Sequence, residues 1–142
     1  MQKRKPKTIA KLVDEAAVRL QLYVRLKAAD SNGYVSCVTC GVTRHYLDGM
    51  QGGHFIQRAR TQVKLTEENV NPQCNICNGP CGTSAAGNPI AYTKYMQDTY
   101  GQEFIDELVL ESQKTRKYTK GEVVEFLAWI NPLIAELQKE KG

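Results

Sequence analysis

Two short stretches, CVTCG at residues 37–41 and CNICN at residues 74–78, decide how this chain folds. In each stretch two cysteines are separated by two residues, a spacing at which a tight turn presents both thiolates to one ion. Gly41 suits the turn after the first pair. Two such pairs complete a tetrahedral site, so the sequence predicts a structural zinc ion held by Cys37, Cys40, Cys74 and Cys77.

A dithiol redox pair and unrelated buried cysteines are the alternatives to a metal site. A redox pair usually comes singly within a βαβ pattern, which this sequence lacks. Four thiolates leave no open position for a substrate, which indicates a structural ion. The fifth cysteine, Cys81, is left over and is expected to be a free thiol.

Size and charge place the chain among small globular proteins. With 142 residues and a net charge of +4, it suits one domain with a real core. It holds no apolar run of the roughly 20 residues that cross a bilayer, and its basic N-terminus does not lead into an apolar signal core. We expect a cytoplasmic protein without membrane contact, with basic residues clustered at Lys3–Lys7, at Arg58, Arg60 and Lys64, and at Lys114–Lys120.

Helical patterns surround the cysteine-rich part of the chain. Apolar spacing predicts an amphipathic helix over 8–29 and further helices from Asn88 to about Tyr100, around 104–109 and after the capping box Thr119-x-x-Glu122, with Pro132 kinking or splitting the last one. Short β-favouring pieces occur at 34–37 and 54–56, and glycines near the second indicate tight turns or close backbone approach. The expected fold is α+β: one domain over 1–142, with a basic N-terminal helix (1–30), a zinc-stapled core (34–100) and C-terminal helices (101–142).

A histidine framed by glycines, GGHFI at residues 52–56, lies between the cysteine pairs. Taken alone, such a histidine would be read as a structural residue. Asn69, five residues before the second cysteine pair, and Asn78, directly after it, change that interpretation. His54, Asn69 and Asn78 resemble the three positions of the HNH nuclease motif, which implies a small ββα-metal core.

A longer match makes the resemblance sharper. GGHFIQRAR at 52–60, LTEENVNPQC at 65–74 and the residues Gly87, Asn88 and Tyr92 resemble the phage recombination nucleases called NinG or Rap. The resemblance is strong over roughly residues 34–110. It implies a structure-specific DNA endonuclease that acts on branched recombination intermediates such as Holliday junctions and D-loops.

The chemistry of phosphodiester hydrolysis fits these residue types. A histidine has an ordinary pKa of about 6.5, which suits a general base near neutral pH, and this gives His54 its expected role. A divalent ion, Mg²⁺ or Mn²⁺, would stabilise the developing charge, with Asn78 as its best protein ligand. Asn69 is expected to orient the loop or the ring of His54 rather than to bind the ion. Arg58, Arg60 and Lys64 are candidates for phosphate contact.

One position departs from the HNH pattern. The residue before the base is commonly acidic or a histidine that binds the metal, but here it is Gly53. The resemblance to the phage-type members implies an acidic residue slightly earlier, where this chain has Gln51. Either Asp48 takes over in a shifted hairpin, or the ion is held more weakly and completed by water and DNA oxygens.

Other functions stay open on sequence grounds. A non-catalytic zinc module that binds DNA or protein explains the cysteines and the basic clusters, and an HNH nuclease of another kind, such as a homing or defence enzyme, would carry similar residues. The apolar last helix is compatible with a homodimer or with packing on its own domain. His45 lacks the glycine context and is expected on the hairpin surface, while Tyr92 and Tyr95 are expected in the core or a groove wall.

Overall fold

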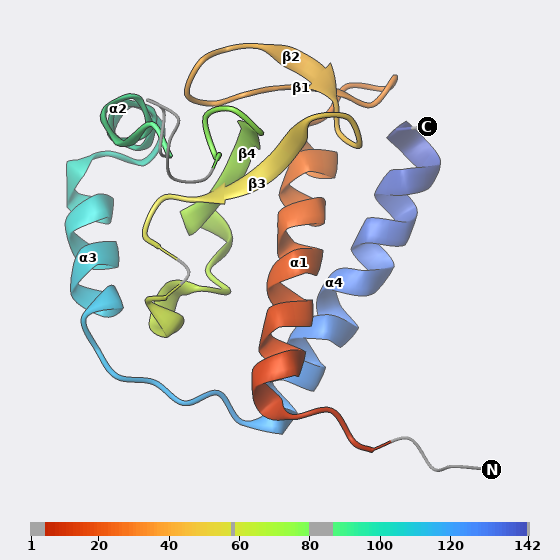
Figure 1. Cartoon of the computed structure of the whole chain (residues 1–142), viewed down its shortest axis with the longest axis vertical. Helices are drawn as coiled ribbons and strands as arrows, with labels where there is room; N and C mark the ends of the chain where they lie inside the picture. Colours follow the sequence, from red (N-terminus) through yellow and green to blue (C-terminus); the bar gives the residue numbers. More distant parts are fainter. Residues whose placement is uncertain (1–4, 58, 80–86, 142) are drawn as a thin grey trace.

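The computed structural model describes residues 5–57, 59–79 and 87–141 (Figure 1). The described part is a mixed α/β structure, as expected. Its elements, in chain order, are α1 (Ile9–Ala28), β1 (Tyr34–Ser36), β2 (Thr43–His45), β3 (Met50–His54), the 3₁₀ turns η1 (Thr61–Val63) and η2 (Glu67–Asn69), β4 (Val70–Cys74), α2 (Pro89–Tyr100), α3 (Gln102–Ser112) and α4 (Lys120–Lys141).

Helix α1 confirms the amphipathic pattern. Thr8 caps it, because its hydroxyl accepts a hydrogen bond from the backbone N–H of Lys11 at 3.2 Å. One stripe of the helix is buried, including Ala16, Leu20 and Leu26, which are fully enclosed. This buried stripe is the face of α1 that belongs to the core.

Helix α4 lies alongside α1 over most of its length (Figure 1). Ile130 and Ile134 of α4 are fully buried in the same core cluster as Leu20, and Arg19 Nε donates to Asn131 Oδ1 at 2.7 Å. Pro132 was expected to kink or split this helix; the split was wrong, since the helix runs unbroken from Lys120 to Lys141. Proline removes one backbone hydrogen bond, but the isoleucines on either side of it hold the helix against α1.

The strands form two separate antiparallel pairs. β1 pairs with β2, and β3 pairs with β4 in a register that sets Met50 opposite Cys74 and His54 opposite Val70. A strand piece at 54–56 was expected, but β3 ends at His54, so that prediction was wrong in its bounds. The strand instead includes the two glycines, and the residues after His54 begin the loop toward η1.

Gly52 and Gly53 are in β3 because neighbours come too close for a side chain. A Cβ on Gly52 would lie 2.6 Å from Gln21 Cβ of α1, and a Cβ on Gly53 would lie 1.9 Å from Gln73 Oε1. The expectation of close backbone approach is therefore confirmed. The absence of a side chain at Gly52 lets α1 pack directly against β3.

Helix α2 begins at Pro89 and ends before Gly101, as expected. Asn88, directly before the helix, makes no capping hydrogen bond with its side chain. Its backbone is left-handed (φ 48°), and its amide Nδ2 instead donates to Cys77 Sγ at 3.6 Å. Tyr92 and Met96 of α2 are buried with Ile105 and Leu108 of α3 in a second core cluster. Among the described residues, no helix is long and apolar enough to span a membrane.

Replacing Gly53 by alanine tests the close contact between β3 and Gln73. We expect Gly53→Ala to lower the free energy of unfolding by about 1–3 kcal/mol, because the new methyl group overpacks a buried site. Urea denaturation measures the change. Gly121→Ala is the control, since the nearest atom to its added Cβ is 4.0 Å away, and it should change stability by no more than about 1 kcal/mol. Equal effects of the two substitutions would contradict the contact.

Candidate metal centre and active-site cavity

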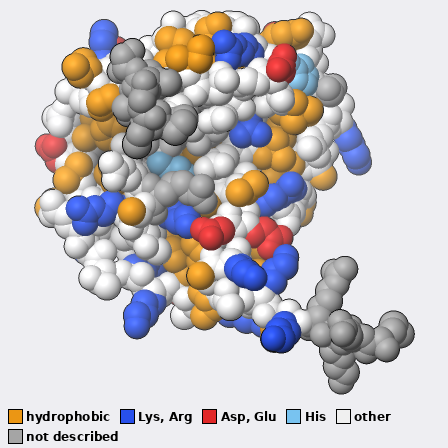
Figure 2. Space-filling model, in the orientation of Figure 1, with side chains coloured by type: hydrophobic (Ala, Val, Ile, Leu, Met, Phe, Trp, Pro, Cys, Tyr) orange, Lys and Arg blue, Asp and Glu red, His pale blue; other side chains and the backbone are white. Residues whose placement is uncertain are grey.

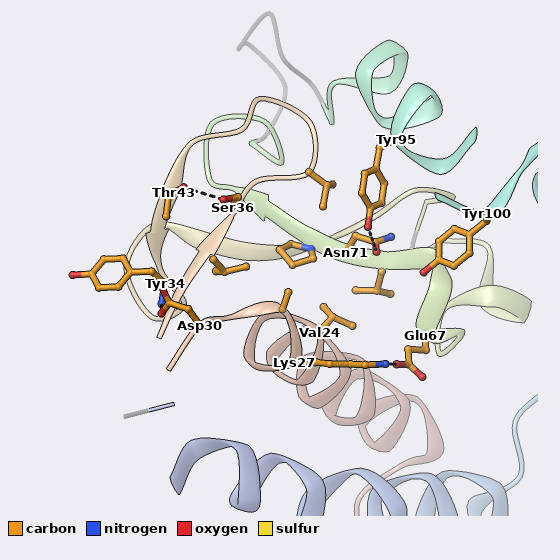
Figure 3. Close-up of a pocket in the computed structure, with 15 residues that line it drawn as sticks. Val24, Lys27, Asp30, Tyr34, Ser36, Thr43, Glu67, Asn71, Tyr95 and Tyr100 are labelled. Carbon is orange, nitrogen blue, oxygen red and sulfur yellow. Dashed lines mark hydrogen bonds and ion pairs between the residues drawn. The ribbon is translucent and has the colours of Figure 1, made fainter. Parts of the chain in front are cut away.

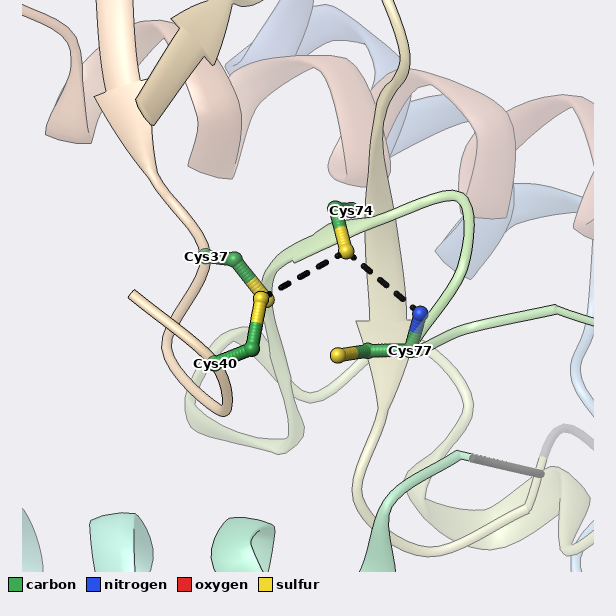
Figure 4. A group of neighbouring side chains, drawn as sticks. All are labelled: Cys37, Cys40, Cys74 and Cys77. Atoms are coloured by element: carbon green, nitrogen blue, oxygen red, sulfur yellow. Dashed lines mark hydrogen bonds between the residues drawn. The ribbon is translucent and has the colours of Figure 1, made fainter. Parts of the chain in front are cut away.

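The two cysteine pairs converge on one point in space (Figure 4). The sulfur atoms of Cys37, Cys40, Cys74 and Cys77 all lie within 4.8 Å of one another. Cys40 Sγ and Cys74 Sγ are 3.7 Å apart, close to the roughly 3.8 Å edge of a tetrahedron with Zn–S bonds of about 2.3 Å. The four thiols therefore fit a metal ion such as zinc, as the spacing predicted.

The surroundings of Cys37 and Cys40 shift the pKa values of these two thiols in opposite directions. Burial opposes ionisation of Cys37, but hydrogen bonds from Thr39 and from backbone groups outweigh it and lower its pKa to about 6. For Cys40 a backbone hydrogen bond at Val42 favours the thiolate, but burial and the other three thiols prevail and raise its pKa to about 12. Zinc binds thiolates, so binding of the ion to this cluster releases protons.

A cavity of about 600 Å³ opens next to the metal centre. It joins three parts of the chain: α1, strand β3 with the loop after it, and the turn after β4. Asn78 reaches it because its backbone N–H donates to Cys74 O at 2.9 Å, which continues the turn that holds the second cysteine pair. The described residues that line the cavity are Gln21, Arg25, Gln51, Gly52, His54, Gln57, Asn78, Gly79 and Gly87.

The ring of His54 contacts the backbone of the loop between β3 and β4. His54 Nε2 lies 3.0 Å from the backbone carbonyl oxygen of Lys64. A carbonyl can only accept, so Nε2 carries the hydrogen and donates it. In the neutral ring the lone pair is therefore on Nδ1.

Asn69 fastens the two arms of that loop together. It is fully buried, and its Nδ2 donates to the carbonyls of Ile56 at 3.1 Å and Val63 at 3.2 Å. Its Oδ1 accepts from the N–H of Ile56 at 2.8 Å. Asn69 is not among the cavity-lining residues. These bonds match the expected loop-orienting role, because the carbonyl that holds His54 follows directly after Val63.

Tyr92 of α2 supports β3 through a hydrogen bond. Its hydroxyl donates to Gly53 O at 2.6 Å and accepts from Asn71 Nδ2 at 3.2 Å. Burial raises the pKa of Tyr92 above its ordinary value, so the hydroxyl stays protonated and keeps its donor. The expectation that Tyr92 belongs to the core is confirmed.

The remaining predicted residues do not all join the cavity. Asp48 is exposed in the turn between β2 and β3 and is not a lining residue. Lys64 forms an ion pair with Asp14 at 2.5 Å, and Arg60 is exposed at the start of η1. Arg58 and Cys81 lie outside the described residues. Figure 2 shows lysines and arginines scattered among acidic and apolar side chains on the face drawn, not a single basic patch.

In place of Asp48, the structure brings Gln51 and Arg25 to the cavity. Gln51 Oε1 accepts from Asn78 Nδ2 at 2.8 Å. Nothing in the sequence singled out Arg25 as a functional residue. It lies on the predicted helix, one turn after Gln21. Its Nε is buried and has no hydrogen-bond acceptor among the described residues. Burial lowers its pKa and the interaction with Tyr46 opposes this, but a guanidinium stays charged.

The fold and the thiol cluster define a small α/β protein with a four-cysteine metal centre beside a polar cavity. The family model described as "Bacteriophage Lambda NinG protein" matches residues 1–140. The chain therefore belongs to the NinG family. No curated protein and no solved structure matched this chain.

Metal analysis tests the thiol cluster directly. We expect a single zinc ion per chain, and we expect chelation to abolish cooperative unfolding, because metal binding contributes to folding free energy. Cys77→Ser should lower the zinc content and the melting temperature, whereas Cys81→Ser should leave both unchanged. Mass spectrometry under native conditions and thermal melts measure these effects. Retention of zinc by Cys77→Ser, or its loss from Cys81→Ser, would contradict the assignment.

Proposed function

We propose that this protein is an HNH-type endonuclease that cuts branched DNA during phage-type homologous recombination. Membership of the NinG family indicates a function connected with phage recombination. The observation that carries the enzymatic part is the shared cavity of His54 and Asn78, which approach it from different segments, beside the thiol cluster. The order of elements also supports it, because a strand pair (β3–β4) is followed by a helix (α2).

In the proposed reaction, His54 acts as the general base. Its Nδ1 takes a proton from a water molecule, the water oxygen attacks the phosphorus, and the bond from phosphorus to the leaving oxygen breaks. The hydrogen bond from Nε2 to Lys64 O holds the required tautomer and supports the positive charge that develops on the ring. Lys64 thus contributes through its backbone, while its ammonium is paired with Asp14.

A divalent ion, Mg²⁺ or Mn²⁺, would supply neutralisation of charge at the phosphate and at the leaving oxygen. Among the described lining residues there is no carboxylate, and the side-chain oxygens are amide oxygens, including those of Gln51 and Asn78. These amide oxygens alone do not form a magnesium site, because protein sites for magnesium normally include one or two carboxylate ligands. This favours the weakly held ion completed by water and DNA over a site that uses Asp48.

Among the described lining residues of the cavity, Arg25 is the one with a permanent positive charge. Arg25 is half-buried, and its enclosed Nε lacks an acceptor among the described residues. In a cavity without carboxylates among its described lining, this arrangement favours an anionic ligand. A phosphodiester oxygen supplies the missing acceptor through a charge-assisted hydrogen bond. We propose that Arg25 holds the scissile phosphate, the role that the sequence had assigned to Arg58 and Arg60.

Removing the base tests the proposed reaction. We expect His54→Ala to reduce kcat on a four-way junction by about 100-fold or more, with junction affinity and the melting temperature retained. Cleavage assays with labelled junction and linear duplex, in Mg²⁺ and in Mn²⁺, measure this. The chain offers a matched control, since His45→Ala removes its other histidine and should leave the rate unchanged. Full activity of His54→Ala would overturn the assignment of the base.

Removing the cation tests the phosphate contact. We expect Arg25→Gln to lower kcat/KM by about 10-fold or more, because a charge-assisted hydrogen bond is lost. Arg25→Lys should restore part of the activity. Arg19→Gln is the control, because Arg19 is on the same helix but contacts Asn131 of α4. Equal effects of the two glutamine variants would show that α1 contributes only bulk charge.

Failure of the wild-type protein to cut junction, flap or duplex DNA with either metal would favour the non-catalytic zinc module. Equal rates on all three substrates would favour an HNH nuclease of another kind.

A further inference from the structure

A second and larger cavity, of about 680 Å³, lies between α1, β1, β2, β4 and α2 (Figure 3). Its volume is within the range of small-molecule sites. The floor is apolar and includes Val24, Val35, Val70 and Pro72. None of the residues proposed for catalysis lines it, so it needs its own explanation.

The charged side chains at this cavity are already engaged. Lys27 Nζ and Glu67 Oε1 form an ion pair at 2.9 Å. Asp30 Oδ1 accepts hydrogen bonds from the backbone N–H groups of Asn32 and Tyr34, both at 2.9 Å. A charged ligand would have to break these contacts, so the cavity favours a neutral one.

Neutral polar groups with spare hydrogen-bonding capacity face the same space. Asn71 is buried, and its Nδ2 is used by Glu68 O at 3.1 Å and Tyr92 Oη at 3.2 Å. Its Oδ1 receives only a long 3.5 Å contact from Tyr95 among the described residues, so it can accept a better hydrogen bond. The hydroxyls of Ser36 and Thr43, 2.9 Å apart, add a donor or acceptor at the other end (Figure 3).

Aromatic rings complete the cavity wall. Tyr95 and Tyr100 both project from α2 on the side of Asn71, and Tyr34 lies at the opposite end (Figure 3). Tyr100 is backed by Phe104, with ring centroids 5.0 Å apart and an interplanar angle of 30°. A planar, uncharged ligand with hydrogen-bonding edges and stacking faces matches these walls, and a nucleobase is such a ligand.

We propose that this cavity takes an unpaired nucleobase of the DNA substrate. Helix α1 relates the two cavities, because Gln21 and Arg25 line the first while Val24 and Ala28 line the second. A strand that crosses α1 can place a phosphate at Arg25 and a displaced base beside Asn71. Bases at a branch point unstack at lower cost than bases in a duplex, so the cavity selects branched DNA. This selection rests on the proposed nuclease function, whereas base binding does not.

Titration with free nucleosides tests base binding without any cleavage. The zinc-loaded protein, labelled with ¹⁵N, is titrated with each of the four deoxynucleosides, and deoxyribose serves as the blank. We expect saturable shifts at Asn71, Tyr95 and neighbouring amides with at least one nucleoside and none with deoxyribose. No saturable shift with any nucleoside, or shifts confined to His54 and Asn78, would overturn the proposal.

Filling the cavity tests the selection of branched DNA. Ala28 is exposed near the end of α1, so Ala28→Phe can place a ring over the opening without disturbing the core. Val18→Phe, at a 55% exposed position on the same helix, is the matched control. We expect Ala28→Phe to abolish the nucleoside shifts and lower the ratio of junction to duplex cleavage on the order of 10-fold, with the duplex rate and melting temperature unchanged.

The two proposals fail in different ways. An unchanged ratio in Ala28→Phe, or an equal fall in Val18→Phe, overturns the selection of branched DNA by this cavity and leaves His54 as the base. Nucleoside binding by a wild-type protein that cuts no DNA supports the base site and overturns the nuclease.

Discussion

The convergence of four thiols is the constraint on which the rest of the structure depends. Cys37 and Cys40 follow β1, whereas Cys74 and Cys77 end β4 and its turn, so one ion would fasten the β1–β2 pair to the β3–β4 pair. The strands themselves are only three to five residues long, and hairpins of that size are not stable alone. Asn78 follows the last cysteine directly, so the same constraint positions a cavity side chain.

The loop between β3 and β4 has its own support, built from hydrogen bonds. Asn69 joins its two arms, and the carbonyl of Lys64 holds the ring of His54. The hydroxyl of Tyr92 donates a hydrogen bond to the backbone oxygen of Gly53. The imidazole is thus held through main-chain atoms that side chains keep in place. This explains how a histidine at the end of a five-residue strand keeps one orientation.

The sequence allowed the cysteine cluster and the helices to be predicted because both follow local rules. Cysteine spacing reports ligand geometry, and the apolar stripe of α1 reports a buried face. The bounds of β3 were missed, because glycine has low strand propensity and only the approach of Gln21 and Gln73 explains its presence. The helix likewise continues through Pro132 because α4 packs against α1, which the local sequence does not reveal. Arg25 could not be foreseen, because its burial beside His54 depends on how α1 crosses the hairpin.

The crowding at Gly53 also limits which residues can replace it over generations. An acidic side chain at position 53 would occupy the space that Gln73 Oε1 fills, with Asn78 Oδ1 3.1 Å from the new Cβ. Such a replacement requires the side chain of Gln73 to move or to become shorter. The two positions are therefore expected to covary, because a carboxylate at position 53 is accommodated most easily beside a shorter residue on β4.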